Sequence, residues 1–236
     1  MVCAHAQRRG SKPAEPAEPE TQNKQYMMPQ TTTRLMALAV LLIAGMVMGG
    51  EPAPGYAVPS RSFAEDIFQH GASELALTSG ALFSPLVNNG KRPVIDFTIT
   101  ELQYGYMLGS AKGTGWLRGN WEVLGEGFGG AVFTSNGSYI AGMTGLLRYN
   151  FVPRTGRFAP FAQGGLGVTF TDIDRDIVGQ TFNFNLDIGI GLRYLVARDC
   201  SVNLEYRLQH TSNADLAPVN EGINAWGPIL GVSFYF

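Results

Sequence analysis

The stretch TFNFNLDIGIGLRYLV at residues 181–196 decides the fold class of this chain. Apolar side chains occupy every even position from Phe182 to Val196, whereas polar side chains or glycine occupy the odd positions from Thr181 to Arg193. A strict period of two predicts a β-strand with one apolar face. The strand is also longer than the five or six residues that are usual in soluble sheets.

Other segments repeat this alternation, most regularly after residue 139. The sequence predicts eight strands, near residues 73–83, 95–108, 114–126, 139–152, 158–171, 181–196, 201–212 and 224–236. Long strands that are apolar on one face only fit tilted spans of a bilayer, as in an antiparallel transmembrane β-barrel. In the second strand the apolar face switches between Ile99 and Leu102, which predicts a bulge near Thr100.

A soluble sandwich or a lipocalin-like barrel is the main alternative, with the apolar face turned inward. Charged residues in the middle of the polar faces favour the membrane instead, because a small barrel would hold them as a paired interior network without a channel. They are Arg118, Glu122, Arg148, Asp187, Arg193, Glu205 and Arg207. The final residues GVSFYF also resemble the assembly signal of outer-membrane barrels, so the outer-membrane assembly machinery is an expected partner through Phe236.

Composition excludes several other classes of protein. The formal net charge of −2 provides no basic field for nucleic acid. Charged residues make up only 15%, and the 30 glycines and 11% aromatic residues suit a barrel with tight turns and aromatic belts. The cysteines are Cys3 and Cys200, so a mature chain without Cys3 has no internal disulfide, and no zinc-ligand spacing is present.

The N-terminal part has the composition of an exported protein. Residues 1–26 form a Pro- and Glu-rich extension that we interpret as disordered or as lying before the true start. Residues 27–57 are predicted to be a signal peptide, because Arg34 precedes an apolar run at 35–48 that is too short for a transmembrane helix. A buried core helix is the alternative. The barrel is then expected over residues 58–236.

The predicted connections alternate in length. Short turns at residues 108–113, 153–157 and 197–200 suit the periplasmic side, and longer loops at 84–94, 128–138, 172–180 and 213–223 suit the outside. His70, before the first strand, is then a solvated periplasmic residue. His210 and Ser212 continue the apolar row of the seventh strand at its outer end. These two residues could be part of an activated nucleophile, or they could mark the point where the strand leaves the hydrocarbon. The alternation of side chains alone leaves both interpretations open.

A resemblance to a known family bears on this choice. The motif HTSNA at residues 210–214, followed by PVNEGI at 218–223, resembles the C-terminal hairpin of the lipid A 3-O-deacylases, the PagL-like acyloxyacyl hydrolases. The resemblance implies an eight-stranded outer-membrane barrel that hydrolyses lipopolysaccharide in the outer leaflet. Ser212 would be the nucleophile, His210 the general base, and Asn213 part of the oxyanion hole. It implies no metal and no cofactor.

This chain departs from the family pattern at two positions. Asn224 stands where the family has the glutamate that orients the histidine, and Glu221 in the same loop is a substitute acid or a solvated carboxylate. Asp215 stands where the family often has a small residue. We therefore expect a hydrolase that removes an ester-linked 3-hydroxyacyl chain from lipid A. The alternatives are a weak or inactive relative that binds lipopolysaccharide, and a structural or adhesion barrel; whether the protein forms a homodimer stays open.

Overall fold

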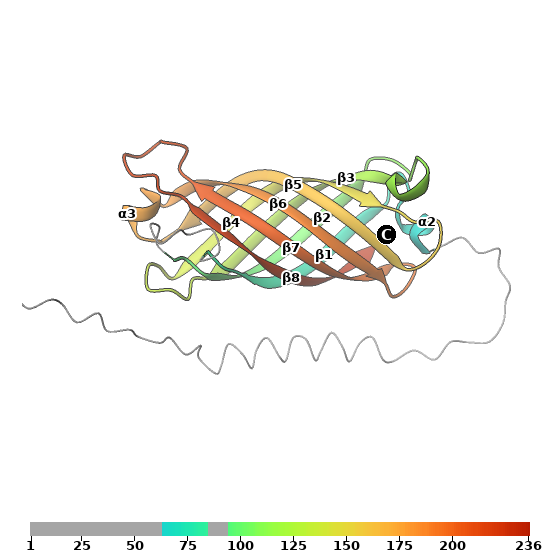
Figure 1. Cartoon of the computed structure of the whole chain (residues 1–236), viewed down its shortest axis with the longest axis horizontal. Coiled ribbons are helices and arrows are strands. Elements are labelled where there is room, and N and C mark those ends of the chain that lie inside the picture. Colours follow the sequence, from blue (N-terminus) through green and yellow to red (C-terminus); the bar gives the residue numbers. More distant parts are fainter. Residues whose placement is uncertain (1–62, 85–93) are drawn as a thin grey trace, which may run out of the picture. The chain divides into compact units, whose positions relative to one another are not determined.

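Eight antiparallel strands close into a barrel in the computed structural model, which describes residues 63–84 and 94–236 (Figure 1). Each strand pairs with the next one in the chain, and β1 pairs with β8. The strands are β1 Ser73–Leu82, β2 Phe97–Met107, β3 Gly119–Ala131, β4 Tyr139–Phe151, β5 Phe158–Thr171, β6 Phe182–Leu195, β7 Cys200–Ser212 and β8 Ile223–Tyr235. The short helices are α2 Phe63–Ile67, the 3-10 turn η2 Gly115–Leu117 and α3 Arg175–Val178. The predicted fold class is confirmed.

Several statements about the N-terminal part lie outside the described residues. They are the predicted extension at 1–26, the signal peptide at 27–57 and the first residues of the predicted barrel domain at 58–62. In the part of the chain that the structure describes, no helix is both long and apolar enough to cross a membrane.

The two faces of each strand are sorted as the alternation predicts. On β6, Ile188 and Ile190 are 53% and 64% exposed on the outer wall, whereas Asp187 and Arg193 are at most 1% exposed inside. The same parity continues on β7, where Leu204 and Tyr206 face outward. An exposed apolar wall around a charged interior is the reverse of a soluble barrel, and it fits a barrel with lipid outside.

Charged side chains fill the middle of the barrel as a paired network, which confirms that part of the prediction. Arg207 binds Glu101, Glu126 and Glu205, with nitrogen–oxygen distances of 2.6 to 2.9 Å. A second group joins Arg148 and Arg193 to Glu74 and Glu122. Gln103 and Gln163 connect the two groups, since each accepts a hydrogen bond from Arg148 and donates one to a glutamate of the Arg207 group.

Two of the residues predicted for this network have other partners. Arg118 lies at the barrel mouth, where its guanidinium binds Glu65 of α2 at 3.3 Å. Asp187 is inside, but the hydrogen bonds recorded for it come from the side chains of Thr144 and Asn185. The prediction of a paired interior therefore holds for Glu122, Arg148, Arg193, Glu205 and Arg207. Asp187 is inside but has polar neutral partners, and the prediction is wrong for Arg118, which precedes β3.

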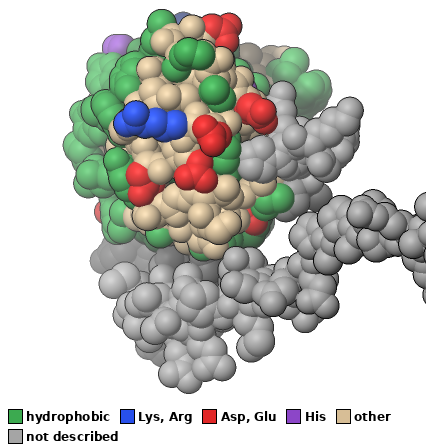
Figure 2. Space-filling model, turned by 90° about the vertical axis from the view of Figure 1, so that its left-hand side faces the viewer, with side chains coloured by type: hydrophobic (Ala, Val, Ile, Leu, Met, Phe, Trp, Pro, Cys, Tyr) green, Lys and Arg blue, Asp and Glu red, His purple; other side chains and the backbone are tan. Residues whose placement is uncertain are grey.

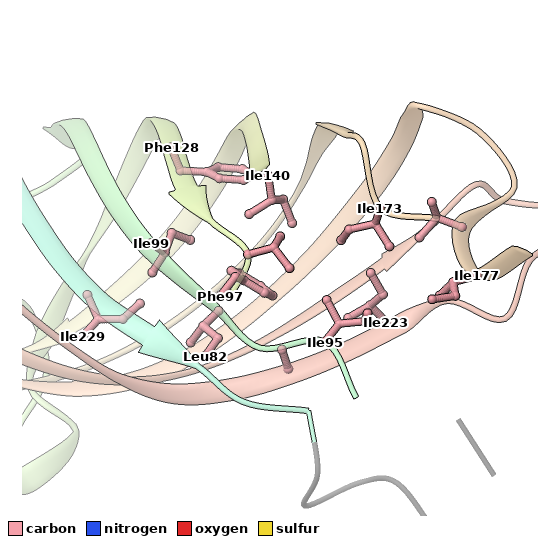
Figure 3. Close-up of a cluster of buried hydrophobic side chains, with 13 residues drawn as sticks. Leu82, Ile95, Phe97, Ile99, Phe128, Ile140, Ile173, Ile177, Ile223 and Ile229 are labelled. Carbon is pink, nitrogen blue, oxygen red and sulfur yellow. The ribbon is translucent and has the colours of Figure 1, made fainter. Parts of the chain in front are cut away.

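Apolar clusters close the interior at both ends. The end that carries α3 is filled by side chains from five strands, from residues next to β2 and β3, and from the segment around α3 (Figure 3). These are Leu82, Ile95, Phe97, Ile99, Phe128, Val132, Ile140, Ile173, Ile177, Val178, Ile223, Ala225 and Ile229. At the other end Ile67 of α2 and the adjacent Phe68 pack against Met107, Leu195 and Tyr235. Buried apolar side chains thus pack inside both ends of the described barrel.

The bulge predicted near Thr100 is wrong. The pairing of β2 with β1 and β3 runs without interruption through this residue. Phe97 and Ile99 point inward into the apolar cluster, while Leu102 points outward toward lipid. The apolar residues change face because the interior itself changes from apolar to charged along the strand.

The third predicted strand began too early. Residues 114–118 belong to the connection between β2 and β3, which contains η2, and β3 starts at Gly119. That connection is thus longer than predicted, although the β4–β5 and β6–β7 turns at its end of the barrel are short. The opposite end carries α3 and the β7–β8 loop, as Figure 1 shows. Short turns assign the α2 end to the periplasm and the α3 end to the outside.

Candidate active site

His210 and Asn224 face each other across the β7–β8 pair near the outer rim. They are directly opposite in register, and His210 Nδ1 lies 2.8 Å from Asn224 Oδ1. An amide oxygen only accepts, so in this arrangement the ring donates from Nδ1. The neutral imidazole then has its lone pair on Nε2, which is the form that a general base requires.

Ser212 is the next residue on the outward row of β7. It and His210 are both half-buried, and Ser212 pairs with Phe184 of β6. Gly222, with a φ of +67°, borders both side chains: a Cβ there would lie 3.3 Å from His210 Cε1 and 3.6 Å from Ser212 Cβ. Within the described residues no hydrogen bond joins His210 to Ser212, and such bonds often form only when substrate is bound.

Asn213 turns away from this row and is completely buried. Its side-chain nitrogen donates to the carbonyl of Val178 at 3.0 Å and to that of Val219 at 2.6 Å. Both protons of the side-chain amide therefore have acceptors already. Through these two bonds Asn213 ties the start of the β7–β8 loop to the C-terminal end of α3 and to the far side of the same loop.

The loop after Ser212 is held in an unusual backbone conformation. Ala214 and Asp215 have φ values of +52° and +62°, in the left-handed region that side chains rarely adopt. Asn220 spans the loop, because its Oδ1 accepts from the Asn213 N–H at 3.1 Å and its Nδ2 donates to Asp215 Oδ1 at 2.8 Å. Strain of this kind persists only where neighbouring contacts enforce it.

Glu221 occupies a different position from Asn224. Its side chain is exposed, and its backbone N–H donates to the carbonyl of Ile177 at 3.1 Å. Among the described contacts, the group on His210 Nδ1 is the amide of Asn224, and no bond from Glu221 to the ring is recorded. The geometry thus brings together His210, Ser212 and Asn224, with Glu221 on the solvent side of the loop.

The surroundings of the site divide into an apolar wall and an acidic rim. Leu186 lies opposite His210 on β6, and Leu208 precedes it on the outward row of β7. Figure 2 views the end that carries α3 and shows acidic side chains gathered there with little positive charge. Exposed acids at this end include Asp172, Asp174, Asp176, Asp215 and Glu221. No cluster of metal-ligating side chains occurs among the described residues.

Sequence reasoning missed Gly222 and α3 as parts of the site. Gly222 was visible in the loop motif, but only the fold shows that it touches His210 and Ser212. The four-residue helix α3 has no periodicity to detect, and its role comes from the two carbonyls of Ile177 and Val178 that hold the neighbouring loop.

Comparisons with family models and with solved structures both find matches to this chain. Residues 99–233 match the family model described as lipid A 3-O-deacylase (PagL). Among solved structures, the outer membrane enzyme PagL is 16% identical, with a TM-score of 0.48 over 68% of this chain and 98% of that chain. Neisserial surface protein A (NspA) is 14% identical, with a TM-score of 0.50 over 70% of this chain and 97% of that chain. No curated protein matches the chain.

The family match runs from β2 into β8 and therefore includes every residue of the candidate site. The likeness to NspA shows the barrel fold. Together with the apolar outer wall, this makes the chain an outer-membrane β-barrel. The chain belongs to the lipid A 3-O-deacylase (PagL) family.

Proposed function

We propose that this protein removes an ester-linked 3-hydroxyacyl chain from lipid A, with Ser212 as nucleophile and His210 as general base. The observation that carries the proposal is the 2.8 Å contact of His210 Nδ1 with Asn224 Oδ1, next to Ser212 on the outward row of β7. That contact leaves Nε2 unprotonated and free to act on the serine.

The chemistry follows the serine hydrolase pattern. Ser212 Oγ attacks the ester carbonyl while His210 Nε2 takes its proton, which gives a tetrahedral oxyanion. When the bond to the sugar oxygen breaks, the imidazolium returns the proton to that oxygen and an acyl-enzyme remains. Water then attacks the acyl carbonyl while His210 Nε2 takes its proton. The bond from the acyl carbon to Ser212 Oγ breaks, His210 returns the proton to Oγ, and the fatty acid is released.

Stabilising the oxyanion requires donors close to Ser212. Because the side-chain protons of Asn213 already bind two carbonyls, we assign this residue to holding the loop. Its part in the oxyanion hole is then indirect. Donors come instead from backbone N–H groups of the segment that follows, where Ala214 and Asp215 adopt their left-handed conformation.

The substrate class follows from the position of the site. A lipid whose acyl chains lie along the outer wall can place a carbonyl at Ser212 without leaving the membrane. Ile188 and Leu186 of β6, together with Leu208 and Tyr206 of β7, form an apolar surface below the site on the membrane side. The site lies at the outer rim, so it faces the leaflet that contains lipopolysaccharide.

A non-catalytic relative that binds lipopolysaccharide is the second candidate. It is favoured by one observation, the amide at Asn224 in place of an acid, because a neutral amide does not stabilise the imidazolium that forms during attack. In this case the outer wall would still bind lipid A, but the acyl chain would stay attached.

Mass spectrometry of lipid A tests the proposal. The folded protein is mixed with lipopolysaccharide and compared with Ser212→Ala and His210→Ala. Loss of one 3-hydroxyacyl group, abolished by both substitutions, supports the hydrolase. Thr211→Ser, an inward-facing neighbour in the same strand, is the matched control and should leave activity intact. Unchanged lipid A with the folded native protein, across several lipopolysaccharides, would favour the binding relative.

A further inference from the structure

A pocket on the outer wall near the periplasmic end has no part in the proposed reaction. Its volume is about 680 Å³, and it lies where the β2–β3 connection meets the outward faces of β3 and β4. Leu108, Ser110, Lys112, Trp121, Leu147 and Tyr149 are among the side chains that line it. The candidate active site is at the opposite end of the barrel.

Aromatic side chains place this pocket at the membrane interface. Trp121 and Tyr149 meet edge to face with ring centroids 4.9 Å apart, and Tyr149 contacts Phe151 at 5.0 Å. The Tyr149 hydroxyl donates to the carbonyl of Leu117 at 2.7 Å, which holds the β2–β3 connection beside the wall. Tryptophan and tyrosine concentrate at the level of lipid headgroups.

The β2–β3 connection itself has apolar residues where a periplasmic turn would normally be polar. Trp116 is 80% exposed and Leu117 is 53% exposed. Exposed side chains of this size are stable where the surrounding medium is partly apolar. Contact with the inner leaflet would account for the exposure of these side chains and of Trp121.

One positive charge borders the apolar part of the pocket. Lys112 is the only lysine in residues 63–84 and 94–236, and within these residues it forms no ion pair. A backbone bridge between Lys112 and Gly119, with two hydrogen bonds of 2.9 Å, fixes its position in the turn. A lysine at this depth extends its ammonium toward the phosphate layer and keeps its stem in apolar surroundings.

We propose that this pocket is a binding site for an anionic phospholipid of the inner leaflet. The phosphodiester lies against the Lys112 ammonium, and one acyl chain lies along Trp121 and Leu147. The lysine complements the negative phosphodiester of a phospholipid. The aromatic and outward apolar side chains complement its headgroup region and its acyl chain. The site is independent of lipid A hydrolysis and retains its lipid whether or not Ser212 is active.

Tryptophan quenching by brominated lipid tests the site directly. The chain has three tryptophans, and Trp226→Phe removes the one outside this region. The folded barrel is placed in vesicles that mix phosphatidylcholine and phosphatidylglycerol, with bromine on one lipid at a time. We expect quenching to show that phosphatidylglycerol is preferred over phosphatidylcholine next to Trp116 and Trp121 by about fivefold. This preference corresponds to about 1 kcal/mol, the effect of one basic residue near an anionic headgroup.

Two substitutions make the result specific. Lys112→Gln should nearly abolish the preference for phosphatidylglycerol. Arg154→Gln removes one charge from an exposed turn at the same end without lining the pocket, and should keep the preference. The proposal is overturned by equal quenching from both lipids in the parent, by a preference that survives Lys112→Gln, or by an equal loss in Arg154→Gln. Circular dichroism confirms that each variant is folded.

Discussion

His210 and Asn224 are joined by a hydrogen bond of 2.8 Å between opposite residues of β7 and β8. The bond keeps Nε2 as an acceptor only while the amide presents Oδ1 to the ring. If the amide turned over, its NH₂ group would donate to Nδ1 and the ring proton would move to Nε2, which removes the base. In the serine protease triad, an amide in place of the acid costs about 10⁴ in turnover for this reason.

We therefore predict that Asn224→Glu raises kcat for lipid A deacylation by at least about tenfold, because a carboxylate accepts from Nδ1 in either orientation and stabilises the imidazolium. Asn224→Leu, which removes the acceptor, should lower kcat below that of the native protein. Initial rates of fatty acid release measure both effects. A kcat that is unchanged in both folded variants would mean that Asn224 has no orienting role.

Gly222→Ala should reduce kcat by about tenfold or more while the barrel stays folded. The added Cβ would lie 3.3 Å from His210 Cε1, closer than most such contacts, at a φ of +67°. Gly156→Ala is the matched control, since Gly156 also has a positive φ, of +93°, but nothing lies within 4 Å of its Cβ position. Equal losses in the two variants would show that backbone strain alone explains the effect.

Removing the charge of Asp215 should increase activity. Its carboxylate lies in the strained loop that follows Ser212 and accepts from Asn220 Nδ2, so it opposes the negative charge of the oxyanion. Asp215→Asn keeps the side-chain oxygen and tolerates the left-handed φ of +62°. We expect kcat to rise about threefold to tenfold at low salt, and less at high salt. A rate that falls in Asp215→Asn would contradict this electrostatic role.

Arg207→Met should destabilise the barrel strongly. Arg207 is completely buried among Glu101, Glu126 and Glu205, and its removal leaves these carboxylates without a cation. The loss of one partner from a buried ion pair costs about 3–5 kcal/mol. Urea unfolding in lipid vesicles measures it. Arg154→Met, at an exposed turn residue, should change stability by less than about 0.5 kcal/mol.

Acid should loosen the contact between two outer loops. The N–H groups of Tyr139 and Ser138 donate to Asp172 at 2.9 and 2.8 Å and hold the pKa of its carboxyl below its ordinary value of 3.8. A lowered pKa stabilises the folded loop above pH 3.8, and this contribution disappears as the pH falls through the lowered value. Protection of the Ser138 and Tyr139 amides, measured as their hydrogen exchange rate relative to that of an unprotected amide at the same pH, should therefore fall in acid. The effect should be absent in Asp172→Asn.

The sequence predicted the strands well because lipid imposes a simple rule on the outer face. Every span must present apolar side chains on alternate residues, so β5 was predicted at Phe158–Thr171 and is found there. The same rule placed His210 and Ser212 of β7 and Asn224 of β8 on the outer face of the barrel, and the family resemblance suggested their roles.

The interior and the connections follow no such rule, and the errors arose there. An inward residue needs only to suit its neighbours, so Phe97 and Ile99 at the apolar end looked like an outer face and suggested a bulge. The family resemblance suggested a part in the oxyanion hole for Asn213, and that role stays a prediction. Its hydrogen bonds to the carbonyls of Val178 in α3 and Val219 in its own loop depend on how the two loops meet, which no local pattern contains.

The interior ion pairs link charge neutrality to completion of the barrel. Their acids are mostly on the first three strands, and their arginines are on β4, β6 and β7. Arg193 on β6, for example, binds Glu74 on β1 at 2.6 Å, across the lumen. Glu74 also accepts from Ser233 of β8 at 2.5 Å, next to the seam where the first and last strands join. A sheet that entered the membrane without its last strands would expose unneutralised carboxylates to lipid. Closing the barrel in its native register is therefore also the step that pairs these carboxylates with their arginines and removes them from contact with lipid.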